Sequence, residues 1–151
     1  MMQKKYDIYV SYKMSGNGKN GAKENDTNSE INVFPLAKKI SEQLTKRKFN
    51  VFLPHLDEDS ADNIYRRDLE VLQSCRLMIF LHDNDASDGR GVEAQFCVQN
   101  EIPIIIFSSN INSLSPMIRG MPVIRGQIIY TQQNMDLQIN NLITLVQSML
   151  G

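Results

Sequence analysis

The residues best suited to chemistry lie in one stretch, from His82 to Gln95. It contains a carboxylate, Glu93, and three small residues, Ser87, Gly89 and Gly91. The hydroxyl and the backbone amides of these small residues can donate hydrogen bonds to an anion. An apolar run precedes the stretch and a helical pattern follows it. A strand, a Gly-rich turn and a helix in this order bring amides and a helix N-terminus to the carboxyl edge of a sheet, so the sequence predicts an anion site with a carboxylate beside it.

Hydrophobic periodicity predicts the elements that hold this stretch in place. Strands are expected at residues 6–10, 49–53, 77–81, 102–107 and 127–130, the last of them weak. Helices are expected from Val33, with Asn32 as the N-cap, to about Lys46–Lys48, at 61–75, from about Gly91 to Asn100, and at 135–150. Strands that alternate with helices predict one α/β domain spanning residues 1–151. Its expected architecture is doubly wound and flavodoxin- or Rossmann-like, a parallel five-stranded sheet with helices on both faces.

In such a sheet the ligand crevice lies outside the carboxyl ends of the strands. Residues Tyr9–Lys13, His82–Asp85 and Ser108–Asn110 fall there, and Glu93 faces the same edge. Glu93 also fits a purely structural interpretation, as a first-turn helix Glu that complements the macrodipole, and the residues leave both open. For Asp68, in the middle of a helix, the pattern alone favours a solvated carboxylate paired with a neighbouring Arg.

Composition excludes several classes of protein. The chain has 151 residues, a formal net charge of -1 and 42% apolar residues, which disfavours a nucleic-acid binder and disorder. The N-terminal apolar run is too short for a signal peptide or a membrane span, so we expect a cytoplasmic protein. Cys75 and Cys97 are expected to be buried free thiols. No metal is expected, because His55 and His82 have no partners at ligand spacing, and no cofactor is expected either.

Four pieces of the sequence carry a resemblance to a known family. They are Ile8-Tyr9, the run Arg67 to Gln73, the run Ser87 to Glu93 and the run Leu114 to Gly120. In this order and spacing they resemble the nucleoside 2-deoxyribosyltransferase superfamily, and within it the nucleoside 5'-monophosphate N-glycosidases. The resemblance spans most of the chain apart from the long first loop and the region after Met121.

The resemblance implies cleavage of the bond between a nucleobase and the sugar C1'. Glu93 would attack C1' and form a glycosyl-enzyme intermediate, which water resolves in a hydrolase and a second base resolves in a transferase. Asp68 would place the sugar or assist proton transfer, and Tyr9 would orient the nucleophile. Glycosidic cleavage through a covalent intermediate typically uses two carboxyl groups about 5 Å apart. The resemblance therefore favours a functional role for Asp68.

The resemblance also implies a 5'-phosphate and a homodimer. Relatives that act on unphosphorylated nucleosides carry Asp where Ser87 stands, and a carboxylate there would repel a phosphate. Ser115 would reach the phosphate from the partner subunit, giving shared sites. Gly89, Gly91 and Lys13 complete the predicted phosphate site, with Lys13 or Ser15 substituting for a family loop that this chain lacks. Asp88 fits this site poorly unless Arg90 offsets its charge.

Two alternatives accompany the hydrolase. Base exchange by a deoxyribosyltransferase uses the same chemistry. The run Tyr6 to Tyr12 also resembles the opening of a TIR domain, an interaction or NAD-cleaving module of the same topology. A second recognisable TIR motif is missing, and the run Leu114 to Gly120 has no place in that fold.

Overall fold

The computed structural model describes residues 5–12, 33–54, 61–83 and 88–151. Within these ranges the strands form one parallel sheet in the order β2-β1-β3-β4-β5. The strands are β1 (Ile8–Ser11), β2 (Val51–Phe52), β3 (Leu77–His82), β4 (Ile104–Ser108) and β5 (Ile124–Ile129). The helices are α1 (Val33–Lys46), α2 (Ala61–Ser74), α3 (Asp88–Gln99), the short α4 (Pro116–Arg119), α5 (Met135–Leu150) and a 3-10 turn, η1 (Ile111–Ser113). This is the flavodoxin-like order, and it confirms the predicted fold class.

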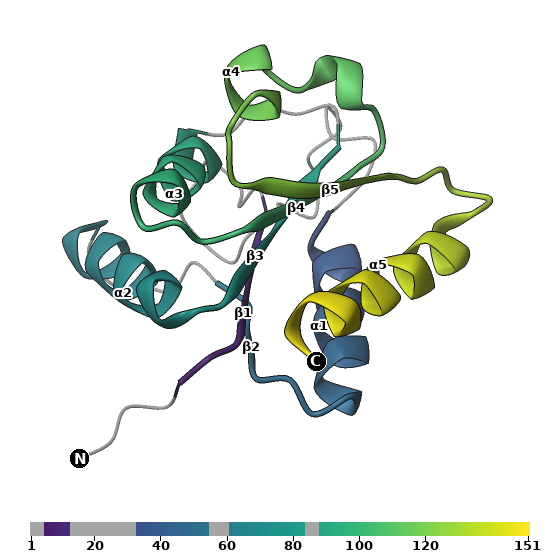
Figure 1. Cartoon of the computed structure of the whole chain (residues 1–151), viewed down its shortest axis with the longest axis horizontal. Coiled ribbons are helices and arrows are strands. Elements are labelled where there is room, and N and C mark those ends of the chain that lie inside the picture. The colour runs from purple at the N-terminus through teal and green to yellow at the C-terminus, as the bar shows by residue number, and fades with distance from the viewer. Residues whose placement is uncertain (1–4, 13–32, 55–60, 84–87) are drawn as a thin grey trace.

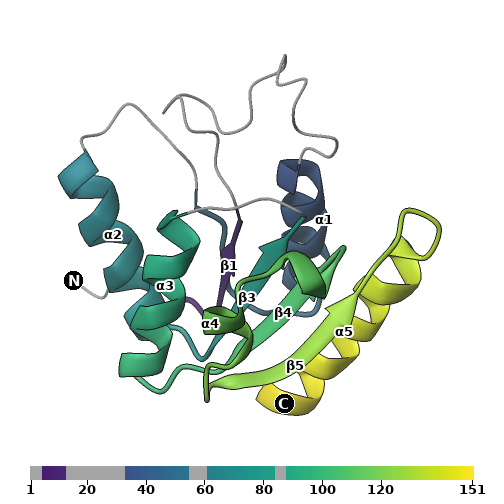
Figure 2. The same ribbon diagram turned by 90° about the horizontal axis from the view of Figure 1, so that it is seen from above.

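The sheet is covered on both faces, as Figures 1 and 2 show. Helices α1 and α5 pack on one face, where they share an apolar cluster with Ile8 and Val10 of β1. Helices α2 and α3 pack on the other face, in a second cluster that contains Tyr9. Successive side chains of a strand point to opposite faces. Strand β1 therefore sends Tyr9 and Ser11 to the face covered by α2 and α3.

Several element boundaries differ from the predictions. Strand β1 begins two residues later than expected and ends at Ser11 rather than Val10, and β2 is only two residues long. Helix α5 matches its predicted range. Helix α4 was not predicted, although Pro116 suits its first position because proline lacks the N–H that would have no acceptor there. The predicted N-cap Asn32 lies outside the described residues.

Helix α3 begins at Asp88, not near Gly91. The two glycines weakened the helical pattern at this point, because glycine has low helix propensity. The earlier start moves Glu93 from the predicted first turn to the second turn. The macrodipole acts mainly within the first turn, so the structural interpretation of Glu93 loses most of its basis.

A close approach joins α5 to the edge strand β5. A Cβ atom added at Gly126 would lie 2.7 Å from Cδ2 of Leu145, so only glycine lets the helix pack this near without a shift. Among the described residues, no helix is both long and apolar enough to cross a membrane.

Candidate active site

The carboxylate of Glu93 is held at both oxygens by side chains of β1. The Tyr9 hydroxyl donates a hydrogen bond to Oε2. The Ser11 hydroxyl donates to Oε1 over 2.8 Å. Tyr9 and Ser11 are two residues apart and lie on the same face of the strand, so both reach the one side chain that α3 presents there. The structure thus brings together Glu93 and Tyr9, as the sequence predicted, and adds Ser11.

Burial dominates the electrostatics of Glu93. The pKa of its carboxyl is raised from 4.5 to about 7 in total. Desolvation by burial is the largest cause and the nearby charge of Asp68 acts in the same direction, whereas the hydrogen bonds from Tyr9 and Ser11 and the charge of Arg90 lower the pKa. The carboxyl is therefore only partly ionised at neutral pH, a property that is common among functional carboxylates.

Tyr9 is a neutral donor at physiological pH. Burial raises the pKa of its phenol well above 10.0, and the charges of Glu93 and Asp68 raise it further. Its ring is fully buried and packs against the ring of Phe52, with centroids 5.4 Å apart. Because the ring cannot move freely, the hydroxyl stays directed at Glu93.

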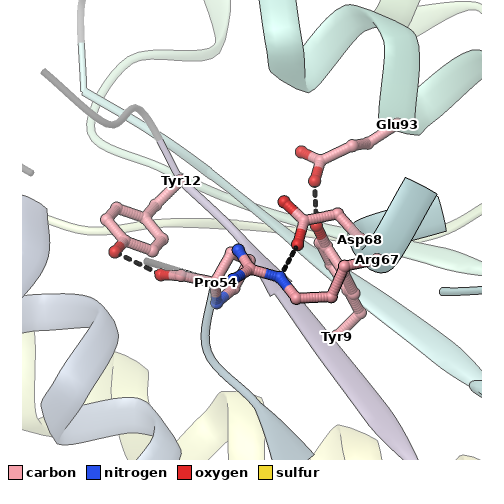
Figure 3. A network of polar contacts seen from close by, with 6 residues as sticks. All are labelled: Tyr9, Tyr12, Pro54, Arg67, Asp68 and Glu93. Carbon is pink, nitrogen blue, oxygen red and sulfur yellow. Dashed lines mark hydrogen bonds and ion pairs between the residues drawn. The ribbon is translucent and has the colours of Figure 1, made fainter. Parts of the chain in front are cut away.

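Asp68 is a buried carboxylate next to this pair. It is 6% exposed and receives a hydrogen bond from Nε of Arg67, 3.0 Å from its Oδ1. Figure 3 shows the carboxyl groups of Asp68 and Glu93 and the Tyr9 hydroxyl gathered from α2, α3 and β1. The sequence pattern predicted a solvated carboxylate paired with a neighbouring Arg. The structure confirms the pairing, but Asp68 is buried rather than solvated. A carboxylate is seldom buried without a specific reason, so Asp68 belongs to the candidate site.

Tyr12 connects the ends of two neighbouring strands. Its hydroxyl donates to the carbonyl oxygen of Pro54 over 2.5 Å (Figure 3). Burial raises the pKa of Tyr12 to about 12, helped by the negative charges of Asp68 and Glu93. The phenol therefore stays protonated and fixes the chain that leaves β2 against the end of β1.

Arg90 holds the start of α3 against the end of β3, next to the candidate site. It is 2% exposed, its Nη1 donates to the carbonyl oxygen of Leu81, and its guanidinium carbon lies 5.2 Å from the centroid of the Phe80 ring. These contacts tie the first turn of α3 to the end of β3, one helical turn before Glu93. The sequence suggested only that Arg90 offsets Asp88.

Of the predicted phosphate residues, the structure describes Gly89, Gly91 and Ser115. Gly89 and Gly91 lie in the first turn of α3, where the early amides lack acceptors within the helix. Gly91 also lines a groove of about 530 Å³ between α2 and α3, together with exposed Tyr65 and Val92. Ser87 and Lys13, like His55 and the Gly-rich first loop, lie outside the described residues.

Ser115 lies apart in sequence and sits at the N-terminus of α4. It is exposed, and its hydroxyl accepts a hydrogen bond of 3.2 Å from the amide of Met117. A hydroxyl that accepts in this way still has its own hydrogen to donate. Ser115 therefore keeps the donor that binding a phosphate requires.

His82 has a structural role at the end of β3. It is buried, and its Nε2 lies 2.6 Å from the hydroxyl oxygen of Ser113 in η1. Within the described ranges, no group of three or more His, Cys, Asp or Glu side chains gathers to hold a metal ion. Cys75 and Cys97 are buried free thiols, and burial raises the pKa of each to about 12.

Sequence reasoning placed Ser11 and Tyr12 at the ligand edge without assigning them a role, and it missed the inward position of Arg90. The signal for Ser11 was present, because any residue two positions from Tyr9 in a strand shares its face. No comparable signal existed for Tyr12, whose partner is a backbone carbonyl 42 residues away.

Comparison with known proteins gives structural matches only. Neither protein families nor curated protein sequences gave a match. A CMP N-glycosidase, BcmB, from Clostridium botulinum has a similar structure, with a TM-score of 0.61 at 17% identity over 90% of this chain and 98% of that one. A 2-deoxyribosyltransferase from Bacillus psychrosaccharolyticus gives a TM-score of 0.56 at 16% identity over 87% and 90% of the two chains. The 2-desoxiribosyltransferase from Leishmania mexicana gives 0.50 at 14% identity over 70% and 65%.

At these identities the similarity establishes a shared fold. It is the fold of the superfamily that the sequence pieces resemble, with an N-glycosidase and two deoxyribosyltransferases among the structural neighbours. The resemblance is therefore confirmed in the fold.

Proposed function

We propose that the protein hydrolyses the N-glycosidic bond of a nucleoside or deoxynucleoside 5'-monophosphate. The products are the free base and the sugar 5-phosphate. One observation carries the proposal: the Glu93 carboxylate is held at both oxygens by β1, with the buried Asp68 carboxylate beside it at the carboxyl edge of the sheet. Two carboxyl groups at one ligand edge are the minimum that glycosidic cleavage through a covalent intermediate requires.

In the first step an ionised Glu93 oxygen forms a bond to the sugar C1'. The bond from C1' to the base nitrogen breaks, and the base leaves with the electron pair and gains a proton. In the second step water attacks C1', loses a proton and releases the Glu93 carboxylate. Oxocarbenium character develops at C1' in both steps, and the negative charges of Asp68 and Glu93 stabilise it.

Asp68 has two roles open to it in this scheme. It can accept a hydrogen bond from a sugar hydroxyl, or it can carry the proton that the leaving base gains. Arg67 stabilises its ionised form through the 3.0 Å contact, which favours the sugar-binding role in the free protein.

A phosphate site at the start of α3 is supported by the helix N-terminus and by Gly89, which has no side chain to obstruct an approaching anion. Ser87, Gly91, Lys13 and Ser115 complete the proposed site. The hydroxyl of Ser87 favours a phosphorylated substrate over a nucleoside, because a hydroxyl can donate a hydrogen bond to the phosphate, whereas a carboxylate at this position would repel it.

A homodimer forms part of the proposal, with Ser115 reaching the phosphate of the partner's site. Ser115 is exposed, and Met117, two residues later, has 81% of its surface exposed. Both side chains are therefore accessible to a partner subunit. Light scattering on the purified protein tests this, and a monomer at assay concentration that still cleaves nucleotides contradicts it.

Base exchange is the second candidate, favoured by the two deoxyribosyltransferases among the structural neighbours. Incubation with a nucleoside and a second free base separates the two activities, because only a transferase yields a new nucleoside.

A panel of ribo- and deoxynucleoside monophosphates, scored for released base, tests the main proposal. We expect release from at least one of them and slower release from the matching nucleoside. Consumption of NAD without any nucleotide cleavage would contradict the proposal and favour the TIR-like alternative.

A further inference from the structure

We propose that Ser11 is a second positioning residue for Glu93, which with Tyr9 fixes the plane of the carboxylate and stabilises its charge. The inference rests on the proposed role of Glu93 as nucleophile.

The geometry of β1 carries the proposal. Tyr9 and Ser11 are both fully buried and stand on one face of the strand, and each donates to a different oxygen of the same carboxylate. The terminal torsion of a glutamate side chain has a broad energy well, so one hydrogen bond leaves the carboxylate plane free to turn. Two donors on one rigid strand remove that freedom.

This arrangement keeps Glu93 reactive. A carboxylate has about four lone-pair positions, two on each oxygen. One donor on each oxygen leaves a lone pair on each for attack at C1'. Tyr9 alone would hold one oxygen and leave the orientation of the other undetermined.

The surrounding charges explain why a second donor is needed. Burial in the site and the negative charge of Asp68 both oppose ionisation of Glu93, and the Tyr12 phenol, one residue past the end of β1, is neutral. Arg90 at the start of α3 and the two hydroxyl donors favour ionisation. Arg67 already pairs with Asp68. Removing Ser11 therefore leaves Tyr9 and Arg90 to stabilise the charge against burial and Asp68.

The test compares Ser11→Ala with Ser11→Thr, which keeps the hydroxyl, and with Ser108→Ala as a matched control. Ser108 is also a fully buried serine at the end of a strand, but its hydroxyl oxygen accepts from the amide of Asn110. The first measurement is the pH dependence of kcat/KM for base release from a nucleoside monophosphate. In Ser11→Ala we expect the acid limb to move to higher pH, lowering kcat/KM at pH 7 by about ten-fold more than at pH 9. Ser11→Thr and Ser108→Ala should keep the acid limb of the original protein.

An equal loss at every pH in Ser11→Ala would overturn the proposal, since that result fits a structural role alone. If Ser11→Ala does not fold, Ser11→Cys replaces it, because a thiol has a similar shape but is a weak donor.

The second measurement does not depend on activity. Glutamate labelled with carbon-13 at the carboxyl carbon lets NMR follow the titration of Glu93 directly, with Glu93→Gln used to assign its signal. We expect this signal to titrate at higher pH in Ser11→Ala, and unchanged titration would overturn the proposal. If the original protein releases no base from any nucleotide while the titration still moves, the proposed function fails and the hydrogen-bonding role of Ser11 stands.

Discussion

The two faces of the sheet are built from the same strands but differ in what they bury. The face under α1 and α5 holds an apolar cluster of mainly aliphatic residues with three buried aromatic residues, Tyr12, Phe107 and Tyr130. The face under α2 and α3 holds a second apolar cluster and, within or beside it, the charged residues Asp68, Arg90 and Glu93. Strand β1 contributes Ile8 and Val10 to the first face and Tyr9 and Ser11 to the second. The face under α1 and α5 therefore contributes to the stability of the fold. The face under α2 and α3 also buries charged groups, which costs free energy of folding.

Replacing Glu93, the proposed nucleophile, should give the largest effect on activity and the clearest functional difference between the two faces of the sheet. Glu93→Gln keeps the size of the side chain but cannot form the glycosyl ester, so we expect kcat for base release to fall by at least about 10³-fold. The exposed Glu70 of α2 provides the control, and Glu70→Gln should retain full activity. Retention of most of the activity in Glu93→Gln would remove Glu93 from the mechanism.

Truncating a buried side chain under α1 and α5 should lower stability but leave activity unchanged. Leu142 of α5 is fully buried in the apolar cluster. Leu142→Ala should lower the free energy of unfolding by about 2–5 kcal/mol, while kcat of the folded protein stays near its original value. Urea denaturation measures the first quantity, and the exposed Leu137→Ala, on the same helix, should change it by less than about 0.5 kcal/mol. A large fall in kcat for folded Leu142→Ala would show that the two faces are not separate.

Burying Glu93 on the face under α2 and α3 should make the free energy of unfolding depend on pH. The pKa of Glu93 is raised from 4.5 to about 7, so the folded state binds a proton more tightly than the unfolded state. Stability from this group is therefore greatest below pH 4.5 and falls as the pH rises through 7. The full shift corresponds to about 3 kcal/mol. Glu93→Gln should consequently gain stability relative to the original protein between pH 4 and pH 8, and thermal unfolding at the two pH values measures the gain. A constant difference would mean that Glu93 titrates normally.

These predictions depend on residues that sequence reasoning could find to different degrees. Glu93 and Tyr9 were placed at the ligand edge from the sequence alone, because they lie in or after strands with clear apolar runs, although their roles came from the resemblance. Asp68 was found only through the resemblance, since a helical Asp beside an Arg has the pattern of a solvated residue. Burial of Asp68 depends on how α2 packs against β1, and packing of this kind is not encoded within a short window of sequence.

The start of α3 shows a second limit of sequence reasoning. Local propensity placed it near Gly91, whereas the buried contacts of Arg90 with the end of β3 favour a start at Asp88. Tertiary contacts outweighed the low helix propensity of two glycines. The register of β1 is a favourable case, because period-two alternation alone assigns Tyr9 and Ser11 to one face.

Removing the hydrogen bond from Tyr9 to Glu93 should lower activity without disturbing the opposite face of the sheet. Tyr9→Phe keeps the buried ring and its contact with Phe52 but removes the donor to Oε2 of Glu93. A hydrogen bond to a charged group contributes about 1.5–3 kcal/mol, so we expect kcat to fall by about 10- to 100-fold. Tyr6→Phe, whose ring also contacts Phe52, is the control and should leave kcat near its original value. An unchanged kcat in Tyr9→Phe would show that the orientation of Glu93 comes from elsewhere.

The smallest effect should appear in substrate selectivity. Ser87→Ala and Ser115→Ala should each raise KM for a monophosphate by about ten-fold while raising KM for the matching nucleoside far less. Ser148 on the surface of α5 offers a control, and Ser148→Ala should change neither value. Equal effects on both substrates would show that these serines bind no phosphate.

The long separation of Tyr9 and Glu93 in the chain has a consequence for biosynthesis. The two residues are 84 positions apart, and β1 pairs with β3 across a comparable distance. Contacts of such span form late, because closing the intervening chain costs entropy before the contact gives anything back. A nascent chain that has emerged only as far as α2 contains Tyr9, Ser11 and Asp68 but not Glu93. Under the proposed mechanism the growing polypeptide is thus inactive until β1, β3 and α3 have come together.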